Sequence, residues 1–405
     1  MEFSEDLIQY VFSWLPAKPI YRFKGVCKSF SEFSTNELFA WTQARNLRVE
    51  DDSGFFIQSS ISTWFQDCDK VEYHSLPGEQ LFSGVPQKSL QFLENTGSKV
   101  LASSNGLILC QNTKTPDDHN LFLCNPTTQT WLTIPTPQDL GKVNWPRRVV
   151  LECNINNPIS DPDHQDYMLL IIQPPRDWVP YYECKIYSPK EGTWMEKKVH
   201  GFGPRRLHLD MPVYHNGAVH FVSYCCDPSR RRGSVYYRPY IVAYDINNDT
   251  TRKLRLPNDA RKGSNDTLHE SNLGIFKWGS RKSSSESICL VRLKKCVFTA
   301  WVLRDYDSVS WIRIMKIRVR AMGLMEPNPN YIAGFTVMNG KTLLFATRKK
   351  VYSYNMMDRS QQIEQVCEHQ CQYGNWNVCF TSYSNTLHPL GIGAATLPDI
   401  YKDFP

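Results

Sequence analysis

Apolar side chains recur at helical spacing over the first forty-odd residues. A first stripe follows the candidate N-cap Ser4 and comprises Leu7, Ile8, Val11, Phe12 and Leu15. Pro16 and Pro19 then break and restart the chain, and a second stripe comprises Ile20, Phe23, Val26, Cys27 and Phe30. A third segment begins at the candidate N-cap Asn36 and carries Leu38, Phe39, Trp41 and Leu47. The pattern predicts three short helices with more apolar surface than so small a domain buries alone.

After Leu47 the helical period gives way to short apolar runs separated by turns. Asn-Gly, which favours a type I′ hairpin turn, occurs between such runs at Asn105-Gly106, Asn216-Gly217 and Asn339-Gly340. Each hairpin is followed by a third and a fourth run. Two further copies with longer hairpin loops contain residues 184–194 and 300–312. The three glycines are 111 and 123 positions apart. With one copy in each gap, the period is about 55–60 residues, above the ~40–50 typical of propellers.

Repeated four-stranded units without helices favour a β-propeller. Five copies can be read directly. A sixth blade is predicted from both ends of the chain, which would close the ring: Phe55-Phe56-Ile57 and Val71-Glu72-Tyr73 with Val378-Cys379-Phe380-Thr381. A β-sandwich is the alternative that the repeat leaves open. The predicted fold is mainly β, with a small domain of three helices followed by a propeller of about six blades.

Two groups of motifs resemble a known family. The N-terminal residues Asp6-Leu7-Ile8, Val11-Phe12, Leu15-Pro16, Lys18 and Arg22-Phe23-Lys24-x-Val26-Cys27-Lys28-Ser29-Phe30 resemble the F-box of plant F-box proteins. Ser104-Asn105-Gly106-Leu107-Ile108, followed by Cys124-Asn125-Pro126-Thr127-Thr128-x-x-Trp131, is similar to their F-box-associated, kelch-like domain. The chain departs from the F-box pattern at Met1-Glu2-Phe3-Ser4, where Leu-Pro is usual, and at Phe30, where Trp is common.

The resemblance implies a domain organisation. Residues 1–47 would be the F-box, 48–98 a connecting segment with a part in the closing blade, 99–385 the kelch-like propeller and 386–405 a C-terminal tail. It also implies a non-catalytic substrate receptor of an SCF-type (Skp–cullin–F-box) E3 ubiquitin ligase. A Skp-type adaptor, and through it a cullin–RING ligase, would be bound by Leu7, Ile8, Val11, Leu15, Pro16, Ile20, Phe23, Val26, Cys27 and Phe30. The alternative is a scaffold or ligand-binding propeller with a vestigial F-box.

Charge adds a hypothesis about the target. The net charge of +6, from 46 basic and 40 acidic residues, is mild and makes nucleic acid an unlikely partner. Basic clusters nevertheless occur in predicted loops: Arg205-Arg206, Arg230-Arg231-Arg232, Lys294-Lys295 and Arg348-Lys349-Lys350. We expect several of them on one face of the propeller, where Arg205, Arg206, Arg231 and Tyr237 are candidates for binding an acidic or phosphorylated target protein. Solubilising charge is the alternative.

The sequence also predicts the compartment. No run reaches the roughly 18 apolar residues that a membrane span needs, and the chain begins directly with acidic and helical sequence rather than a signal peptide. Thirteen cysteines at irregular spacing then favour free thiols in a reducing environment. We expect a protein of the cytoplasm, the nucleus or both, with no membrane partner.

No motif predicts a catalytic, metal or cofactor site. Cys367-x-His369-x-Cys371, with Cys379 downstream, lacks the two matched pairs of structural zinc sites. Asp161, Asp163 and Asp166 lack the turn glycine and terminal Glu of a calcium loop. His215 and His220 flank a hairpin turn without a nucleophile elbow, and Gly391-x-Gly393 lacks the third glycine of a dinucleotide motif. The sequence therefore predicts a protein that is not an enzyme.

Overall fold

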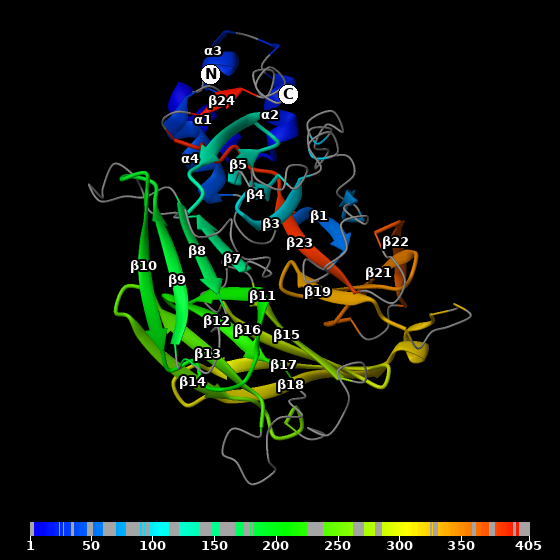
Figure 1. Cartoon of the computed structure of the whole chain (residues 1–405). Coiled ribbons are helices and arrows are strands. Elements are labelled where there is room, and N and C mark those ends of the chain that lie inside the picture. Colours follow the sequence, from blue (N-terminus) through cyan, green and yellow to red (C-terminus); the bar gives the residue numbers. More distant parts are fainter. Residues whose placement is uncertain are drawn as a thin grey trace.

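In the computed structural model, four helices precede a ring of six β-sheets (Figure 1). This confirms the predicted fold class: mainly β, with an N-terminal helical region and a six-bladed propeller. The residues that the structure describes are 4–23, 25–26, 28–33, 36–46, 52–59, 70–77, 90, 93, 98–112, 121–137, 148–153, 167–173, 179, 181–224, 238–261, 271–279, 286–324, 326, 331–358, 362–371, 377–391 and 394–396.

Blades 1 to 5 are antiparallel meanders of consecutive strands. Blade 1 contains β3 (Lys99–Ser104), β4 (Leu107–Gln111), β5 (Leu121–Asn125) and β6 (Thr130–Ile134), with β24 (Ala395–Thr396) added at its outer edge. Blade 2 contains β7 (Arg148–Cys153), β8 (Tyr167–Gln173), β9 (Tyr181–Ser188) and β10 (Thr193–His200). Blade 3 contains β11 (Leu207–His215), β12 (Ala218–Ser223), β13 (Tyr240–Asp245) and β14 (Thr250–Arg255). Blade 4 contains β15 (Ser271–Trp278), β16 (Ser287–Lys294), β17 (Val297–Asp305) and β18 (Ser310–Arg318), and is followed by the 3₁₀ helix η2 (Val319–Met322). Blade 5 contains β19 (Gly334–Met338), β20 (Thr342–Ala346), β21 (Lys350–Asn355) and β22 (Glu364–Glu368).

The sixth blade joins the two ends of the chain. β1 (Asp52–Ser59) lies between β2 (Val71–Ser75) and β23 (Val378–Ser384), so the three runs that the sequence assigned to one blade do pair. The innermost strands β3, β7, β11, β15, β19 and β23 contact one another in a closed circle. Phe56 of β1 lies against Tyr383 of β23, with ring centroids 5.7 Å apart, and belongs to a buried cluster shared with blade 1.

The Asn-Gly hairpins form as predicted. Both residues of each pair have positive φ, for example 45° at Asn105 and 87° at Gly106, as a type I′ turn requires. Gly106 is also needed for a close approach, because a Cβ there would overlap Thr386 Oγ1. In an antiparallel meander the first and third turns lie at the same end. We call the end of the propeller that carries the Asn-Gly turns the hairpin end.

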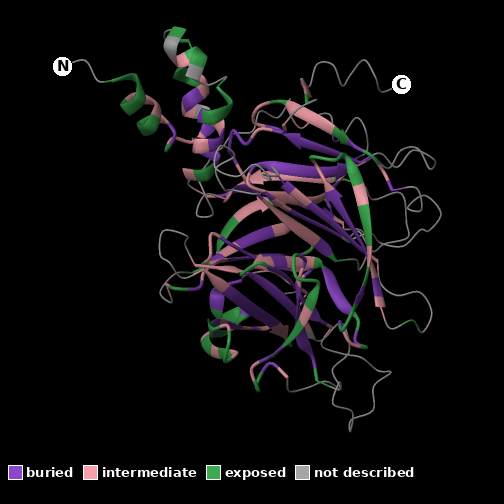
Figure 2. Ribbon diagram, turned by 90° about the vertical axis from the view of Figure 1, so that its left-hand side faces the viewer, coloured by how far each residue is buried: buried purple, intermediate pink, exposed green. Residues whose placement is uncertain are grey.

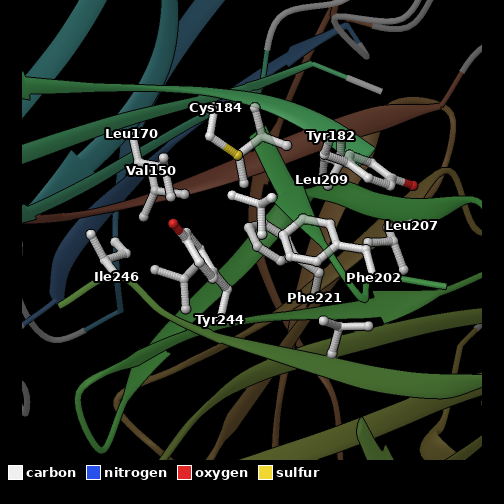
Figure 3. Packing of buried hydrophobic residues seen from close by; sticks show 14 of the residues in the cluster. Val150, Leu170, Tyr182, Cys184, Phe202, Leu207, Leu209, Phe221, Tyr244 and Ile246 are labelled. Atoms are coloured by element: carbon white, nitrogen blue, oxygen red, sulfur yellow. The ribbon is translucent and has the colours of Figure 1, made fainter. Parts of the chain in front are cut away.

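Apolar side chains fill the spaces between neighbouring blades. Between blades 2 and 3, Phe202 lies 6.2 Å from Phe221 and 5.8 Å from Tyr244, measured between ring centroids, inside a larger aliphatic cluster (Figure 3). Strands between two such layers are buried on both sides, which explains the near-continuous apolar run of β8.

The helical region corrects one prediction, because it holds four helices rather than three. They are α1 (Glu5–Phe12), α2 (Ala17–Phe23), α3 (Lys28–Phe33) and α4 (Glu37–Asn46). The second predicted helix is split by a turn at Gly25 and Val26, since glycine is a poor helix former. Both predicted N-caps are confirmed: Ser4 Oγ accepts from Leu7 N–H (3.4 Å) and Asn36 Oδ1 from Leu38 N–H (2.8 Å). No helix in these described ranges is long and apolar enough to cross a membrane.

Candidate functional site

The first helix carries apolar side chains on two faces, where the sequence predicted a single stripe. Ile8, Phe12 and Leu15 turn inward and are half-buried. On the opposite side, Leu7, Tyr10 and Val11 of α1 are exposed at positions i, i+3 and i+4, a spacing that places them on one face, and Trp14 lies in the turn that follows the helix. This α1 outer stripe comprises Leu7 (46% exposed), Tyr10 (57%), Val11 (54%) and Trp14 (44%). The Tyr10 and Trp14 rings are in edge-on contact, with centroids 6.2 Å apart.

The remaining adaptor-binding candidates have different surroundings. Phe23 and Val26 are exposed, whereas Pro16 and Phe30 are half-buried. The rings of Phe12, Phe23 and Phe30 form a small aromatic core. Ile20 is only 3% exposed because it packs against Leu387 from the other end of the chain, so it is not available to a partner in this arrangement. Cys27 lies outside the described residues.

Sequence reasoning missed part of this surface. Tyr10, Trp14 and Leu38 (49% exposed) were not among the candidates. The signal was present, since Tyr10 and Trp14 follow Leu7 at helical spacing. Figure 2 shows exposed residues along the helices, in contrast to the mostly buried strands of the blades.

The helical region is attached to the propeller through residues 386–390, part of the predicted C-terminal tail. Gln43 of α4 is fully buried: its Oε1 accepts from Leu387 N–H (2.8 Å) and its Nε2 donates to Leu15 O (3.2 Å). The Trp41 ring lies against His388, with centroids 4.6 Å apart. On the propeller side, Asn125 Nδ2 donates to His388 O (2.9 Å). The chain end therefore connects α4 to the hairpin end of blade 1.

Replacing Gln43 by Leu is expected to loosen the helical region without unfolding the propeller. The variant leaves the Leu387 N–H and the Leu15 carbonyl without this partner, at a cost of about 1–3 kcal/mol for each buried group left unsatisfied. Hydrogen exchange should accelerate in α4 and remain unchanged in blades 2 to 5. Thr42→Ala is the matched control, because the Thr42 hydroxyl bonds only to Leu38 O within the same helix (2.8 Å). Equal protection of α4 in the two variants would refute this role.

The two ends of the propeller differ in charge. Acidic residues predominate at the hairpin end: Asp52, Glu191, Asp245, Asp249, Glu286, Asp305, Asp307 and Asp358. Basic residues predominate at the opposite end: Lys99, Arg206, Arg238, Arg255, Arg261, Lys294, Lys295, Arg318, Arg320, Arg348, Lys349 and Lys350. We call this second end the basic end. It includes the described members of the basic clusters that the sequence singled out.

Of the four target-binding candidates, the structure describes two, Arg205 and Arg206, and their surroundings differ. Arg205 is 2% exposed, and its Nη2 donates to the carbonyl of Tyr224 (2.7 Å), so it serves the fold of blade 3. Arg206 next to it is exposed at the basic end. Arg231 and Tyr237 lie outside the described residues.

A cavity of about 260 Å³ lies on the propeller axis. All six innermost strands line it, and Asn105, Gly279 and Gly340 place its mouth at the hairpin end. Lys277 Nζ of β15 contacts both carboxylate oxygens of Glu152 of β7, each at 3.3 Å. The cavity is therefore polar and crossed by an ion pair.

The histidines that flank the second hairpin turn belong to the blade packing. His220 Nδ1 faces the carbonyls of Val213 (3.2 Å) and Ala218 (3.1 Å), so this nitrogen carries the proton and Nε2 accepts from Tyr306 O–H (2.8 Å). Burial lowers the pKa of His220 to about 4. A neutral, fully bonded imidazole at this depth holds blade 3 to blade 4.

The cysteine–histidine cluster lies where blade 5 meets blade 6. Cys371 Sγ donates to Ile57 O (3.2 Å), and burial raises the pKa of the Cys371 thiol. His369 Nε2 donates to Thr347 O (3.1 Å). Among the residues that the structure describes, no three His, Cys, Asp or Glu side chains are placed to hold a metal ion. Asp161, Asp163 and Asp166, for which the sequence did not predict a calcium site, and Gly393 lie outside those residues.

Glu72 of β2 ties blade 6 to the end of blade 5. Its carboxylate accepts from Gln370 N–H (2.9 Å) and pairs with His74 (3.2 Å) and Lys70 (3.6 Å). Burial by itself would raise the pKa of Glu72, but hydrogen bonds from His74, Gln370 and Cys371 and the charge of Lys70 lower it to about 2.

Glu72→Gln is expected to destabilise the protein at pH 7 and to lose this effect in acid. Because the folded-state pKa lies below the ordinary value of 4.5, the stabilisation by Glu72 is complete above pH 4.5 and disappears as the pH falls toward 2. Urea unfolding at pH 7, 5, 4 and 3 should show the two free energies of unfolding converging. Glu191→Gln, in the exposed β9–β10 turn, should match the wild type throughout. A Glu72→Gln deficit that does not depend on pH would contradict the assignment.

A match to a known protein family agrees with this architecture. A family described as "F-box protein At3g26010-like, beta-propeller" matches residues 62–384. F-box protein At5g49610 of Arabidopsis thaliana is 22% identical over 363 residues, covering 87% of this chain and 88% of that protein. F-box protein At5g07610 of Arabidopsis thaliana is 23% identical over 269 residues, covering 62% of this chain and 56% of that protein. A solved structure of Aleuria aurantia lectin with alpha-methyl-L-fucoside is 10% identical and covers 69% of this chain and 79% of that chain, with a TM-score of 0.39.

The closed ring with a helical region at its rim defines a β-propeller protein with an additional N-terminal module. The family match extends from the segment before β2 to the last residue of β23 and covers most of the chain. The chain belongs to the F-box protein At3g26010-like β-propeller family.

Proposed function

We propose that this chain is the target-recognition subunit of an SCF-type ubiquitin ligase. In this proposal residues 1–47 are an F-box, whose α1 outer stripe binds a Skp-type adaptor, and the propeller binds the target protein. The observation that carries the proposal is the stripe itself. Seven of the eleven exposed large hydrophobic side chains in the described residues fall between Leu7 and Leu38, and such concentrations mark interaction surfaces.

The energetics support adaptor binding at this stripe. Fully burying an apolar side chain of this size contributes about 1.5–3 kcal/mol. The four side chains of the stripe can therefore offset much of the cost of association. The inward faces of the helices already pack on one another and on Leu387, so a partner finds a preformed surface.

The proposed mechanism is non-catalytic. The chain would hold a target near a ubiquitin-charged conjugating enzyme that the cullin–RING assembly supplies, and the rate gain would come from proximity and effective concentration. The relatives are named F-box proteins, which supports the receptor role. We also propose that the protein acts in the cytoplasm, the nucleus or both.

Ubiquitin transfer tests this proposal. The chain, a Skp-type adaptor, a cullin, a RING subunit and the activating and conjugating enzymes are combined with ubiquitin. We expect ubiquitin to be transferred to lysines of this chain only when the adaptor is present. Ubiquitin transfer that does not depend on the adaptor would count against the proposal. So would a fully assembled complex that transfers no ubiquitin to this chain.

One observation favours a second candidate function. The axial cavity has the size for a small polar ligand, with Lys277 and Glu152 as its charged groups. In that case the chain would be a ligand-binding propeller with a vestigial F-box. It would then remain monomeric and unbound when mixed with the adaptor.

A further inference from the structure

Three arginines lie together at the basic end of blade 3. Arg255 of β14 pairs directly with Tyr240 of β13, and Arg238 lies in the bend just before β13 begins, two residues ahead of Tyr240. Arg261 is folded back toward them by the turn after β14, where its N–H donates to Pro257 O (3.2 Å). Arg238 and Arg255 are exposed and Arg261 is half-buried.

Among the residues that the structure describes, no carboxylate is paired with this group. Burial, and then the charges of Arg238 and Arg255, lower the pKa of Arg261. Within the described ranges no ion pair joins any of the three to a carboxylate, and the nearby Asp259 carboxylate contacts Arg313 instead (3.5 Å). Arg261 donates from Nη2 to the side chain of Asn258, while its buried Nε has no partner among the described atoms.

The neighbouring residues add to the positive potential. Lys253 lies two positions before Arg255 on the same side of β14, with its Nζ 5.5 Å from the centre of the Tyr240 ring. Folding thus holds like charges together on one small surface. Their mutual repulsion is relieved when an anion binds.

We propose that Arg238, Arg255 and Arg261 bind a phosphate monoester on the target protein, the side chain of a phosphorylated serine or threonine. The inference rests on the proposed function, since it names the chemistry by which the propeller would recognise its target. A phosphate monoester carries close to two negative charges at neutral pH and three acceptor oxygens. It therefore offers more charge and one more acceptor oxygen to several guanidinium groups than a single carboxylate does.

The test uses the whole chain and fluorescence anisotropy. The probe is a labelled mixture of short peptides with a fixed central phosphoserine and random flanks, with matched serine and glutamate mixtures for comparison. We expect the phosphoserine mixture to bind about tenfold or more tightly than the serine mixture, because charge-assisted hydrogen bonds are the strong ones. Arg255→Gln should weaken that binding by about tenfold.

Arg252→Gln is the matched control. Arg252 lies on the same strand three residues away, faces the other side and pairs with Asp307 (3.5 Å). Its loss removes the same charge and should leave affinity within about twofold.

Three outcomes would overturn the inference. The first is that the glutamate mixture binds as tightly as the phosphoserine mixture, and the second is that inorganic phosphate does so. The third is that the chain binds a labelled single-stranded oligonucleotide, with steep salt dependence, and does not bind the peptides. Adaptor binding is also measured for the Arg255→Gln variant, so that the phosphate site and the ligase role are tested separately. Phosphopeptide binding without adaptor binding refutes only the ligase role, and adaptor binding without phosphopeptide binding refutes only the phosphate site.

Discussion

Val11→Asp is expected to abolish binding of a Skp-type adaptor while leaving the fold intact. Val11 is 54% exposed in the middle of the α1 outer stripe, so Asp at this position meets water in the free protein. In the complex the carboxylate would be buried without a partner, and the apolar contact of about 1.5–3 kcal/mol would also be lost. Together these effects correspond to at least about a hundredfold loss of affinity. Calorimetric titration of the wild type and the variant with the adaptor measures the change.

Met195→Asp provides the matched control. Met195 on β10 has the same exposure as Val11, 54%, but lies on the outer strand of blade 2. Its variant should bind the adaptor as the wild type does. A Val11→Asp chain that keeps wild-type affinity would show that the adaptor does not use this stripe.

Phe56→Ala is expected to lower the free energy of unfolding of the propeller by about 3–5 kcal/mol. Phe56 is fully buried on β1, in contact with Tyr73 of β2 and Tyr383 of β23. Truncation leaves a cavity in the blade that joins the two ends of the chain. Because the first and last blades of the ring are held together through this blade, the loss should affect the whole unfolding transition, which urea denaturation followed by tryptophan fluorescence reports.

Phe23→Ala makes the same substitution in the helical region, at a side chain that is 38% exposed. In this variant the propeller should unfold at the same midpoint urea concentration as in the wild type. If Phe56→Ala also leaves that transition unchanged, closure of the ring through β1 and β23 does not stabilise the propeller.

Local signals in the sequence were sufficient for most of the fold. Ser4 and Asn36 cap helices because their side-chain oxygens reach backbone N–H groups two or three residues away. The Asn-Gly pairs form type I′ turns because these residue types tolerate positive φ. The sixth blade could be predicted because the ring leaves the first and last strands as each other's partners.

The surroundings of the candidate site could not be predicted in the same way. Ile20 is buried by Leu387, and Gln43 bonds to the same residue across 344 positions of sequence. The sequence predicted that Arg205 is a surface charge, but its guanidinium donates a hydrogen bond to the carbonyl of Tyr224. Such contacts form between segments that are far apart in the sequence, and the local pattern of apolar residues does not predict them.

The division of α1 into two faces is an intermediate case. The sequence showed helical spacing for both sets of apolar residues, but not which set the protein covers itself. The structure places Phe12 inward against Phe23 and Phe30 and leaves Tyr10 and Trp14 outside. Packing of the neighbouring helices therefore decides which residues remain for a partner.

Binding of this chain to a purified Skp-type adaptor can be measured as the mass of the mixture, by size-exclusion chromatography with light scattering. We expect a complex of one chain with one adaptor. A chain that elutes as a monomer of 46.9 kDa beside free adaptor would contradict it, and the ligand-binding propeller would then be the leading explanation.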